Sequence, residues 1–397
     1  MRELELYVHI PFCVKKCDYC DFLSFPAEEN LQWKYVSALM KEVQYYGDVM
    51  QEYEVTTVYI GGGTPSCLDE AWMVRILDVI GDYFHVRRDA EVSIECNPGT
   101  VTGEKLQAYL ANGINRLSIG LQSTHNDELR LLGRIHSFDQ FLRTYEIARG
   151  AGFRNINVDL MSAIPEQTLE KYAESLLRVI RLKPEHISAY SLIIEEGTPF
   201  YDRYKFDRVM QEAGLETKHL PNEEVTYNMM KATQQLCEKY GYRRYEISNY
   251  ARAGYECRHN IGYWDRAEYL GVGIGAASLI GNIRYSNTRD IQTYIENSKK
   301  IELQQFGETI GTNLHESAVT LTKQEEMEEF MYLGLRKVDG VARDEFLKHF
   351  HTPIQAVYRD VMRKLQNQGL LELQAGRVFL TDRGLDLSNY AMAQFLL

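Results

Sequence analysis

Three cysteines near the N-terminus are the residues best suited to chemistry. Cys13, Cys17 and Cys20 form CVKKCDYC, a CxxxCxxC spacing, directly after the apolar run Leu6–Ile10. Three thiolates on one short loop can hold three irons of a [4Fe–4S] cluster, which leaves the fourth iron open for a small molecule. Zinc usually takes four protein ligands, often in two pairs, so it fits this spacing less well. The spacing therefore predicts an iron–sulfur cluster.

The remaining cysteines and the overall charge exclude several classes of protein. The chain has seven cysteines, an odd number, and the sequence has no secretion signal, which argues against a disulfide framework. No apolar run approaches the roughly 18 residues that a spanning helix needs, so we expect a cytoplasmic protein. With 44 basic and 56 acidic residues the net charge is −12. An acidic chain binds phosphate backbones poorly, so no nucleic-acid partner is expected.

Apolar strands alternate with amphipathic helices in the first half of the chain. Six strand–helix units in sequence indicate a parallel sheet, and six are fewer than the eight of a closed barrel. We therefore predict an α/β fold, a partial (β/α)6 barrel, with a doubly wound sheet as the alternative. The expected strands are 6–10, 57–60, 92–96, 116–120, 155–161 and 186–193, and the expected helices include 31–46, 72–83, 103–112 and 138–150.

The rest of the chain divides into two further regions. We expect the barrel to span residues 1–200, an extension to span 201–320, and a separate C-terminal domain to span 321–397. The tail has helical patterns at 325–336, 343–350 and 355–368, then two strands at 370–374 and 377–380, which is the order of a winged helix. That fold commonly binds DNA, but the acidic charge favours a packing or partner role here.

Polar residues follow several of the predicted strands at the point where each strand ends. Gly61–Ser66 follows the second strand, Glu95 and Asn97 end the third, Gln122 ends the fourth and Asp159 ends the fifth. Because active sites of parallel α/β folds lie at the carboxyl ends of the strands, these residues predict one shared site beside the cysteine loop.

The motifs in this order resemble one known family. YVHIPFCVKKCDYCDF at 7–22 is similar to the radical S-adenosylmethionine (SAM) enzymes of the HemN/HemW branch, the oxygen-independent coproporphyrinogen III oxidases and their heme-chaperone relatives. The resemblance implies a [4Fe–4S] cluster whose open iron chelates SAM, and cleavage of SAM to methionine and a 5′-deoxyadenosyl radical. Further matching motifs are GGGTPS at 61–66, IECNP at 94–98, RLSIGLQS at 116–123, LGRIHS at 132–137 and NVDLM at 157–161.

The resemblance also assigns roles to single residues. It implies that Cys13, Cys17 and Cys20 hold the cluster. Tyr19, between two of them, would shield the cluster and stack on adenosine. The other implied ligands are Tyr7, Gly62, Gly63, Glu95 and Ala277 for a first SAM, and Gln122, Arg134 and Asp159, with Gly63 and Thr64 alongside, for a second.

Two features separate the oxidase branch from the chaperone branch. Phe22 stands where the oxidases carry a further cysteine, and CRHNIGYW at 257–264 matches the HNxxYW motif of the chaperones. His259 is then a candidate axial heme ligand and Cys257 a second, while Tyr263 and Trp264 are suited to stack on a porphyrin. A structural loop is the alternative interpretation of this motif.

We therefore expect a heme chaperone that binds heme and passes it to apo-hemoproteins. The resemblance implies a flavodoxin- or ferredoxin-type electron donor. It leaves open whether the client protein is associated with a membrane. The alternatives are an oxygen-independent coproporphyrinogen III oxidase, which makes protoporphyrinogen IX, and a methyltransferase of the same branch.

Overall fold

A single sheet of twelve strands runs through the computed structural model, which describes residues 1–306 and 309–397. Its strand order is β14-β11-β10-β9-β1-β2-β3-β4-β5-β6-β8-β7, and strands β1 to β6 are parallel neighbours in chain order. The predicted partial (β/α)6 barrel is confirmed, although several strands begin earlier than expected. Their bounds are β1 Arg2–Ile10, β2 Tyr53–Gly62, β3 His85–Cys96, β4 Arg116–Gln122, β5 Ile156–Ser162 and β6 His186–Ser191.

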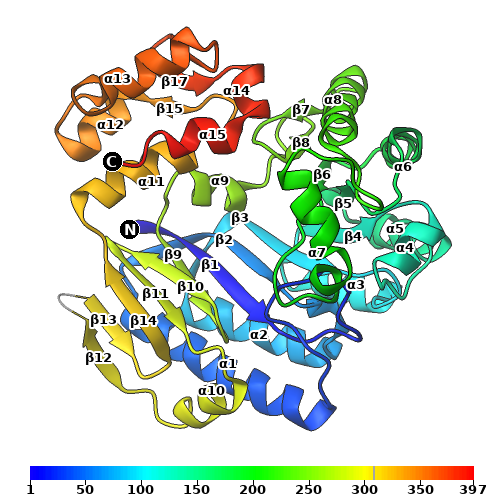
Figure 1. Cartoon of the computed structure of the whole chain (residues 1–397). Coiled ribbons are helices and arrows are strands. Elements are labelled where there is room, and N and C mark those ends of the chain that lie inside the picture. The colour runs from blue at the N-terminus through cyan, green and yellow to red at the C-terminus, as the bar shows by residue number, and fades with distance from the viewer. Residues whose placement is uncertain (307–308) are drawn as a thin grey trace.

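Helices that follow these strands cover the outer face of the curved sheet (Figure 1). Each buries one apolar stripe, as an amphipathic helix on a sheet must. Side-chain caps fix several starts: Ser137 and Gln140 form a capping box before α5, and Thr168 accepts the Lys171 amide before α6. The helices are α1 Glu29–Val49, α2 Glu70–Tyr83, α3 Gly103–Ala111, α4 Asn126–Leu131, α5 Phe138–Ala151 and α6 Leu169–Leu182.

The sheet extends beyond the six parallel strands at both edges. Next to β1 lies β9, Tyr269–Val272, which is also parallel and comes more than 250 residues later in the chain. Antiparallel strands follow at each side, and residues 199–251 form two helices and two short strands. These elements are β10 Ala277–Ile280, β11 Ile283–Asn287, β14 His315–Thr320, β8 Asn249–Ala251, β7 Arg243–Arg244, α7 Pro199–Glu212, α8 Glu223–Lys239, α9 Arg258–Trp264, α10 Ile291–Asn297, β12 Leu303–Phe306 and β13 Thr309–Thr312.

The C-terminal region folds in the helix–helix–helix–hairpin order that its pattern predicts. It adds a short strand and two closing helices to that order and lies at the upper left of Figure 1. Glu329 of its first helix accepts from Arg266 Nε at 2.9 Å and from Arg284 Nη1 at 2.7 Å, which ties the region to the sheet. Its elements are α11 Lys323–Gly334, β15 Val341–Ala342, α12 Arg343–Phe350, α13 Ile354–Asn367, β16 Leu371–Gln374, β17 Arg377–Leu380, α14 Asp382–Asp386 and α15 Ser388–Ala393.

Two large hydrophobic cores hold these regions together. One runs from Leu4 to Leu314 between the sheet and its helices, and the other, which includes Met331, Phe346 and Tyr358, lies inside the C-terminal region. The residue limits expected for the three domains stay predictions. Among the described residues, no helix has the length and hydropathy that crossing a membrane requires.

Candidate cluster and cofactor site

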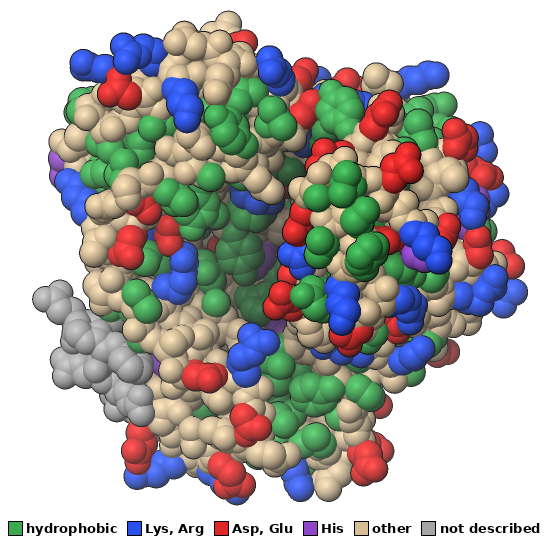
Figure 2. Space-filling view, viewed as in Figure 1, with side chains coloured by type: hydrophobic (Ala, Val, Ile, Leu, Met, Phe, Trp, Pro, Cys, Tyr) green, Lys and Arg blue, Asp and Glu red, His purple; other side chains and the backbone are tan. Residues whose placement is uncertain are grey.

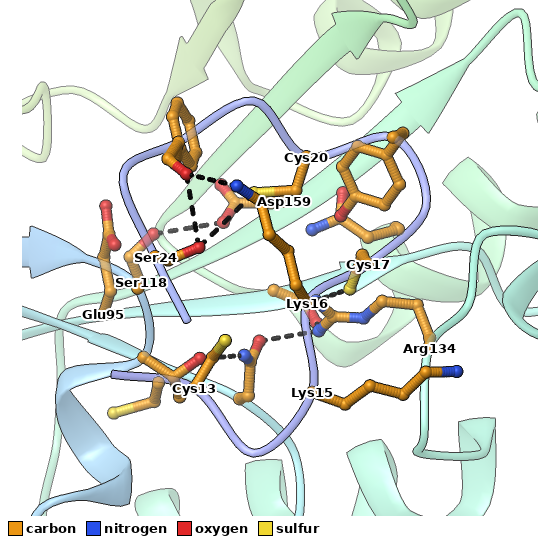
Figure 3. Close-up of a pocket in the computed structure, with 18 residues that line it drawn as sticks. Cys13, Lys15, Lys16, Cys17, Cys20, Ser24, Glu95, Ser118, Arg134 and Asp159 are labelled. Carbon is orange, nitrogen blue, oxygen red and sulfur yellow. Dashed lines mark hydrogen bonds between the residues drawn. The ribbon is translucent and has the colours of Figure 1, made fainter. Parts of the chain in front are cut away.

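The cysteine loop follows β1 directly and is held at its base by backbone hydrogen bonds. The amide of Cys13 donates to the carbonyl of Phe25 at 3.2 Å, and the amide of Phe25 donates to the carbonyl of Pro11 at 2.9 Å. Further out, the amide of Asp18 donates to the carbonyl of Leu132 at 3.1 Å. Figure 3 shows the three cysteines on this one loop, at the carboxyl end of the sheet. These bonds anchor the loop to the segment that follows it and to the end of α4.

The donor set of the loop fits a cluster better than a single metal ion. Cys13, Cys17 and Cys20 are free thiols and partly exposed. Burial raises the pKa of Cys13, and the neighbouring Cys20 and Cys17 raise it further, because thiolates repel one another. A bound cation removes this repulsion. Among the described residues, no three acidic, cysteine or histidine side chains converge to hold one metal ion. A [4Fe–4S] cluster does not need that convergence, since each thiolate binds a different iron.

A glycine turn after β2 forms the wall opposite the cysteines. Gly62 has φ +114°, and a Cβ there would lie 2.4 Å from the ring of His9. The amide of Gly63 donates to the carbonyl of Ile10 at 2.8 Å, and the amide of Thr64 donates to that of Phe12 at 2.7 Å. Only glycine suits this backbone, which brings main-chain groups to the edge of the pocket.

Glu95 at the end of β3 is anchored to the same turn. Its carboxylate accepts from Tyr59 Oη at 3.0 Å and from the amide of Gly62 at 3.1 Å. Burial raises the pKa of Glu95 to about 7, and the nearby carboxylate of Asp159 contributes to the rise. The carboxyl of Glu95 is therefore partly protonated near neutral pH, and it is suited to pair with a cationic ligand group.

Arg134 and Gln122 complete the pocket from the side of β4. Arg134 Nη2 donates to Asn97 Oδ1 and to the carbonyl of Gly120, each at 2.6 Å, and Nη1 lies 3.7 Å from Cys17 Sγ. The Nε of Arg134 is buried and has no partner among the described residues. Gln122 has φ +74°, a strained value for a residue other than glycine. Strain and an unpartnered donor at one edge are typical of a ligand site.

Most of the predicted cofactor residues meet around this one pocket of about 140 Å³. The three cysteines share it with seven others: Tyr19, Gly63, Thr64, Glu95, Gln122, Arg134 and Asp159. Figure 3 shows Glu95 of β3, Ser118 of β4 and Asp159 of β5 facing the cysteine loop, with Arg134 beside Cys17. Sequence order alone brings these side chains to one edge, as expected for a parallel sheet.

Tyr7 and Ala277 line a different pocket, of about 350 Å³, at the open side of the barrel. Its walls come from β1, β9, β10 and β11, from the end of α9 and the segment after it, and from α11 of the C-terminal region. Tyr7 is linked to the glycine turn of the cluster pocket through His9, because its hydroxyl bonds His9 Nδ1 at 2.9 Å and the His9 ring lies against Gly62. Figure 2 shows the molecule hollowed between the C-terminal region and the lobe that carries α7.

His259 lies in neither pocket. It is 1% exposed, its Nδ1 bonds Thr57 Oγ1 at 2.7 Å, and its Nε2 bonds Tyr263 Oη at 3.0 Å. Burial lowers the pKa of His259 to about 3, so the ring is neutral. Both nitrogens are occupied in this conformation, so neither is available to iron here, and the role of His259 as a heme ligand stays a prediction. Cys257 is also buried and points its thiol at Glu91 Oε1, 3.5 Å away.

Sequence reasoning did not single out Arg116, which opens β4 and lies inside the barrel. It is 2% exposed, and its Nε has no partner among the described residues. The available signal was a charged residue at the start of the otherwise apolar run RLSIGLQ, where a buried strand needs a reason to carry a cation.

Comparison with known proteins assigns two family domains to the chain. The radical SAM superfamily model matches residues 7–179, and the HemN C-terminal domain model matches residues 321–387. The fold is similar to that of coproporphyrinogen III oxidase HemN from Escherichia coli, with a TM-score of 0.83, 22% identity, and coverage of 100% of this chain and 90% of that one.

Curated relatives match over almost the whole length. The heme chaperone HemW of Bacillus subtilis is 35% identical over 98% of this chain and 98% of its own length. The heme chaperone HemW of Lactococcus lactis is 34% identical over 98% of this chain and 97% of its own length. Superfamily membership implies a [4Fe–4S] cluster and SAM as cofactors. The chain therefore belongs to the HemW family of radical SAM proteins.

Proposed function

We propose that this protein binds heme and transfers it to apo-hemoproteins. The observation that carries the proposal is the full-length similarity to heme chaperones together with an aromatic pocket built partly from the HNxxYW segment. A chaperone needs a site that holds a porphyrin by stacking and polar contacts and releases it again. The pocket between the barrel and the C-terminal region offers these contacts.

The lining of this pocket suits a porphyrin with its two propionates. Aromatic rings give stacking surface, and two arginines lie at its edge. Among the described residues, Nε1 of Trp264 and Nη2 of Arg266 are buried donors without a partner. Arg266 also has a strained φ of +57°. A propionate would accept from both donors. The aromatic lining residues are Tyr7, Tyr263, Trp264, Tyr269 and Tyr332.

Within this proposal, His259 has a second candidate role, which is to position the pocket wall. Its Nε2 holds the hydroxyl of Tyr263, which lines the pocket, and its Nδ1 is fixed by Thr57. Loss of the imidazole would free the Tyr263 ring to turn. Tyr263→Phe, which removes the same hydrogen bond, should then weaken heme binding as much as His259→Ala does.

The residues of the cluster pocket fall into cluster ligands and SAM ligands. Cys13, Cys17 and Cys20 would hold the cluster, and Gly62, Gly63 and Glu95 would hold the amino-acid end of SAM. When bound, the cluster supplies single electrons at low potential. Tyr19 covers the inner side of the loop, where its ring packs against Phe200 at 6.4 Å between centroids. The other proposed SAM ligands are Thr64, Gln122, Arg134 and Asp159.

Heme titration of the cluster-loaded protein, followed by Soret absorbance, tests the proposal. Trp264→Phe keeps a ring but removes the donor, so heme should bind roughly tenfold more weakly, the usual effect of losing one hydrogen bond to a charged group. Trp33→Phe is the matched control, because Trp33 is 38% exposed on α1 and packs on Trp72. An unchanged heme affinity in Trp264→Phe would show that heme does not bind in this pocket.

Spectra of the same variants decide the role of His259. If His259 binds iron, His259→Ala changes the spectral type of bound heme and Tyr263→Phe does not. If His259 positions Tyr263, both variants lower affinity and leave the spectral type unchanged. Incubation of the heme-loaded protein with an apo-hemoprotein, followed by separation, tests transfer. Retention of all heme on the chaperone would contradict the proposed transfer.

A further inference from the structure

The C-terminal region has its own hydrophobic core and shares little apolar contact with the barrel. Its core begins at Met327, and the barrel core ends at Leu314. Of the apolar side chains packed against the C-terminal core in the described chain, only Ile247 comes from the barrel. Two regions of one chain ordinarily move relative to each other unless a large apolar interface joins them. The boundary between these regions is therefore a place where the molecule can open.

Charged side chains cross this boundary at several points. Glu329 of α11 pairs with Arg266 and Arg284, and the Arg336 guanidinium lies 4.1 Å from the ring centroid of Trp264. Ion pairs fix the orientation of such an interface but add little net stability, because each charge gives up its hydration to form them. The other pairs are Arg266 with Glu326 at 3.5 Å, Lys231 with Asp386 at 2.5 Å, Arg336 with Glu246 at 3.9 Å, and Lys337 with Asp265.

Several buried polar atoms at the boundary have no hydrogen-bond partner within the described chain. Burial without a partner costs free energy, and exposure to water recovers it. Docking of the C-terminal region therefore leaves groups on both sides of the boundary that favour opening. These atoms are Trp264 Nε1, Arg266 Nη2, Glu246 Oε2, Arg336 Nε and Asp386 Oδ1.

A short junction connects the two regions. Leu321 is fixed to the turn between β10 and β11, since its amide donates to the carbonyl of Asn282 at 2.7 Å and its carbonyl accepts from Asn282 Nδ2 at 3.3 Å. The next residue, Thr322, begins α11 with a capping box that it forms with Glu325. Ordered structure therefore ends at Leu321 and begins again at Thr322. Residues at the ends of such elements absorb the backbone rotation of a hinge.

We propose that the C-terminal region is a hinged lid, which rotates about the junction of Leu321 and Thr322 and opens the pocket lined by Tyr332 and Leu333. These two residues of α11 form one wall of that pocket, and the barrel and α9 form the others. The pocket has a volume of about 350 Å³. That volume is toward the lower end of the roughly 300–1,000 Å³ of small-molecule pockets. Rotation of α11 away from α9 widens it.

Bound heme holds this lid closed. As a lid for heme the inference rests on the proposed function, whereas the rotation itself does not. Trp264 Nε1 and Arg266 Nη2 are the donors proposed above for a propionate, so heme supplies partners that the heme-free boundary lacks. A ligand that binds one arrangement more tightly shifts the population toward it. Opening of the lid then precedes heme release.

Hydrogen exchange resolved to single amides measures the rotation without heme, in the unsubstituted cluster-loaded protein. The amide of Val338 donates across the boundary to the carbonyl of Tyr245 at 3.0 Å, so each opening exposes it. Its protection factor should be at least tenfold lower than that of the Leu365 amide, which is buried inside α13. A protection factor for Val338 as high as that of Leu365 would overturn the proposal.

Substitution of the central carboxylate shows whether the ion pairs keep the lid closed. Glu329→Gln weakens the pairs with Arg266 and Arg284, so the protection of Val338 should fall at least tenfold further while that of Leu365 stays the same. Glu345→Gln, at an exposed position on α12, is the matched control and should change neither amide.

A cross-link across the boundary tests whether the lid controls access of heme. Asp265→Cys with Lys337→Cys, in a Cys67→Ser background, places thiols where an ion pair now joins the regions, and a short bismaleimide links them anaerobically. Heme association and release, followed by Soret absorbance, should both slow at least tenfold, and reagent-treated Lys337→Cys should keep the original rates. Unchanged rates after cross-linking would overturn the lid. If the unsubstituted protein binds no heme, the proposed function fails, and Val338 protection alone decides the hinge.

Discussion

The cysteine loop and helix α9 present the same kinds of side chain in opposite ways. Both follow motif-like sequences, CVKKCDYC and CRHNIGYW, and both lie at the inside of the barrel. The loop keeps three thiols at a pocket, whereas α9 buries Cys257 and His259 in hydrogen bonds. The loop sits at the carboxyl ends of the strands, but α9 contacts Glu5, Thr57 and Glu91, each five residues before its strand ends.

The difference shows that residue type does not tell which atoms are available. Five residues along a strand span roughly 16 Å, so the two motifs occupy different levels of the same barrel. At the upper level the chain leaves donors without partners. At the lower level both nitrogens of His259 and the thiol of Cys257 are paired, and α9 closes the barrel from within. Substitutions at the two levels should therefore have different consequences.

The largest effect is expected at the cysteine loop. Cys17→Ala should abolish the visible absorbance of the reconstituted cluster, because a cluster with two protein thiolates is not retained. Absorbance and iron content after anaerobic reconstitution measure it. Cys67→Ser is the control, because Cys67 lies beyond the loop and is itself a free thiol. If Cys17→Ala and the unsubstituted protein have equal iron content, Cys17 does not hold the cluster, and the proposed difference between the two levels is wrong.

A smaller effect is expected at the glycine wall of the cluster pocket. Gly62→Ala forces a Cβ to 2.4 Å from the His9 ring at φ +114°, so SAM should bind at least tenfold more weakly, and stability should fall by about 1–3 kcal/mol. Calorimetry with SAM and a thermal melt check this. Gly81→Ala on α2, where a Cβ meets nothing within 4 Å, should be neutral or slightly stabilising. An unchanged SAM affinity in Gly62→Ala would show that the glycine turn shifts to make room for the added Cβ.

The smallest effect, a pH-dependent change in stability, is expected beneath α9. Glu5 is 5% exposed, its Oε2 has no hydrogen-bond partner among the described residues, and burial raises its pKa to about 9. Its ordinary value is 4.5. The folded state therefore holds a proton that the unfolded state releases, and this contribution to stability is lost as pH rises from about 4.5 to 9.

Glu5→Gln mimics the protonated acid and should remove that loss. Its melting temperature should exceed that of the unsubstituted protein by a few degrees at pH 8, and the difference should shrink toward pH 5. Glu3→Gln, on the same strand with a side chain 72% exposed, should show no such trend. A difference independent of pH would mean that Glu5 is ionised beneath α9.

The sequence predicted the upper level well for a physical reason. In a parallel sheet every strand brings its carboxyl end to the same edge, so Glu95, Gln122 and Asp159 had to meet once the strand order was consistent. The spacing of Cys13, Cys17 and Cys20 likewise depends only on local chain length. Strands β1 to β6 are neighbours in the order in which they occur in the chain, and this made the topology predictable.

The lower level could not be predicted because it depends on contacts between distant segments. Whether His259 faces a pocket or a strand is decided by Thr57, about 200 residues earlier, and by Tyr263. Tyr7 and Ala277 likewise share a pocket with Tyr332 and Leu333 of α11, residues more than 50 positions away in the sequence. Arg116 was missed because a charged residue in an apolar strand gives no sign of whether its charge is paired.

The position of β1 between β2 and β9 has a consequence for synthesis on the ribosome. The first neighbour of β1 is complete by residue 62, but the second is complete only at residue 272. Until then β1 is an edge strand, with the cysteine loop at its end, and unpaired edges invite association with other chains. The chain therefore carries its three free thiols beside an unprotected edge through most of its translation, which makes the interval before residue 272 the vulnerable stage of its biogenesis.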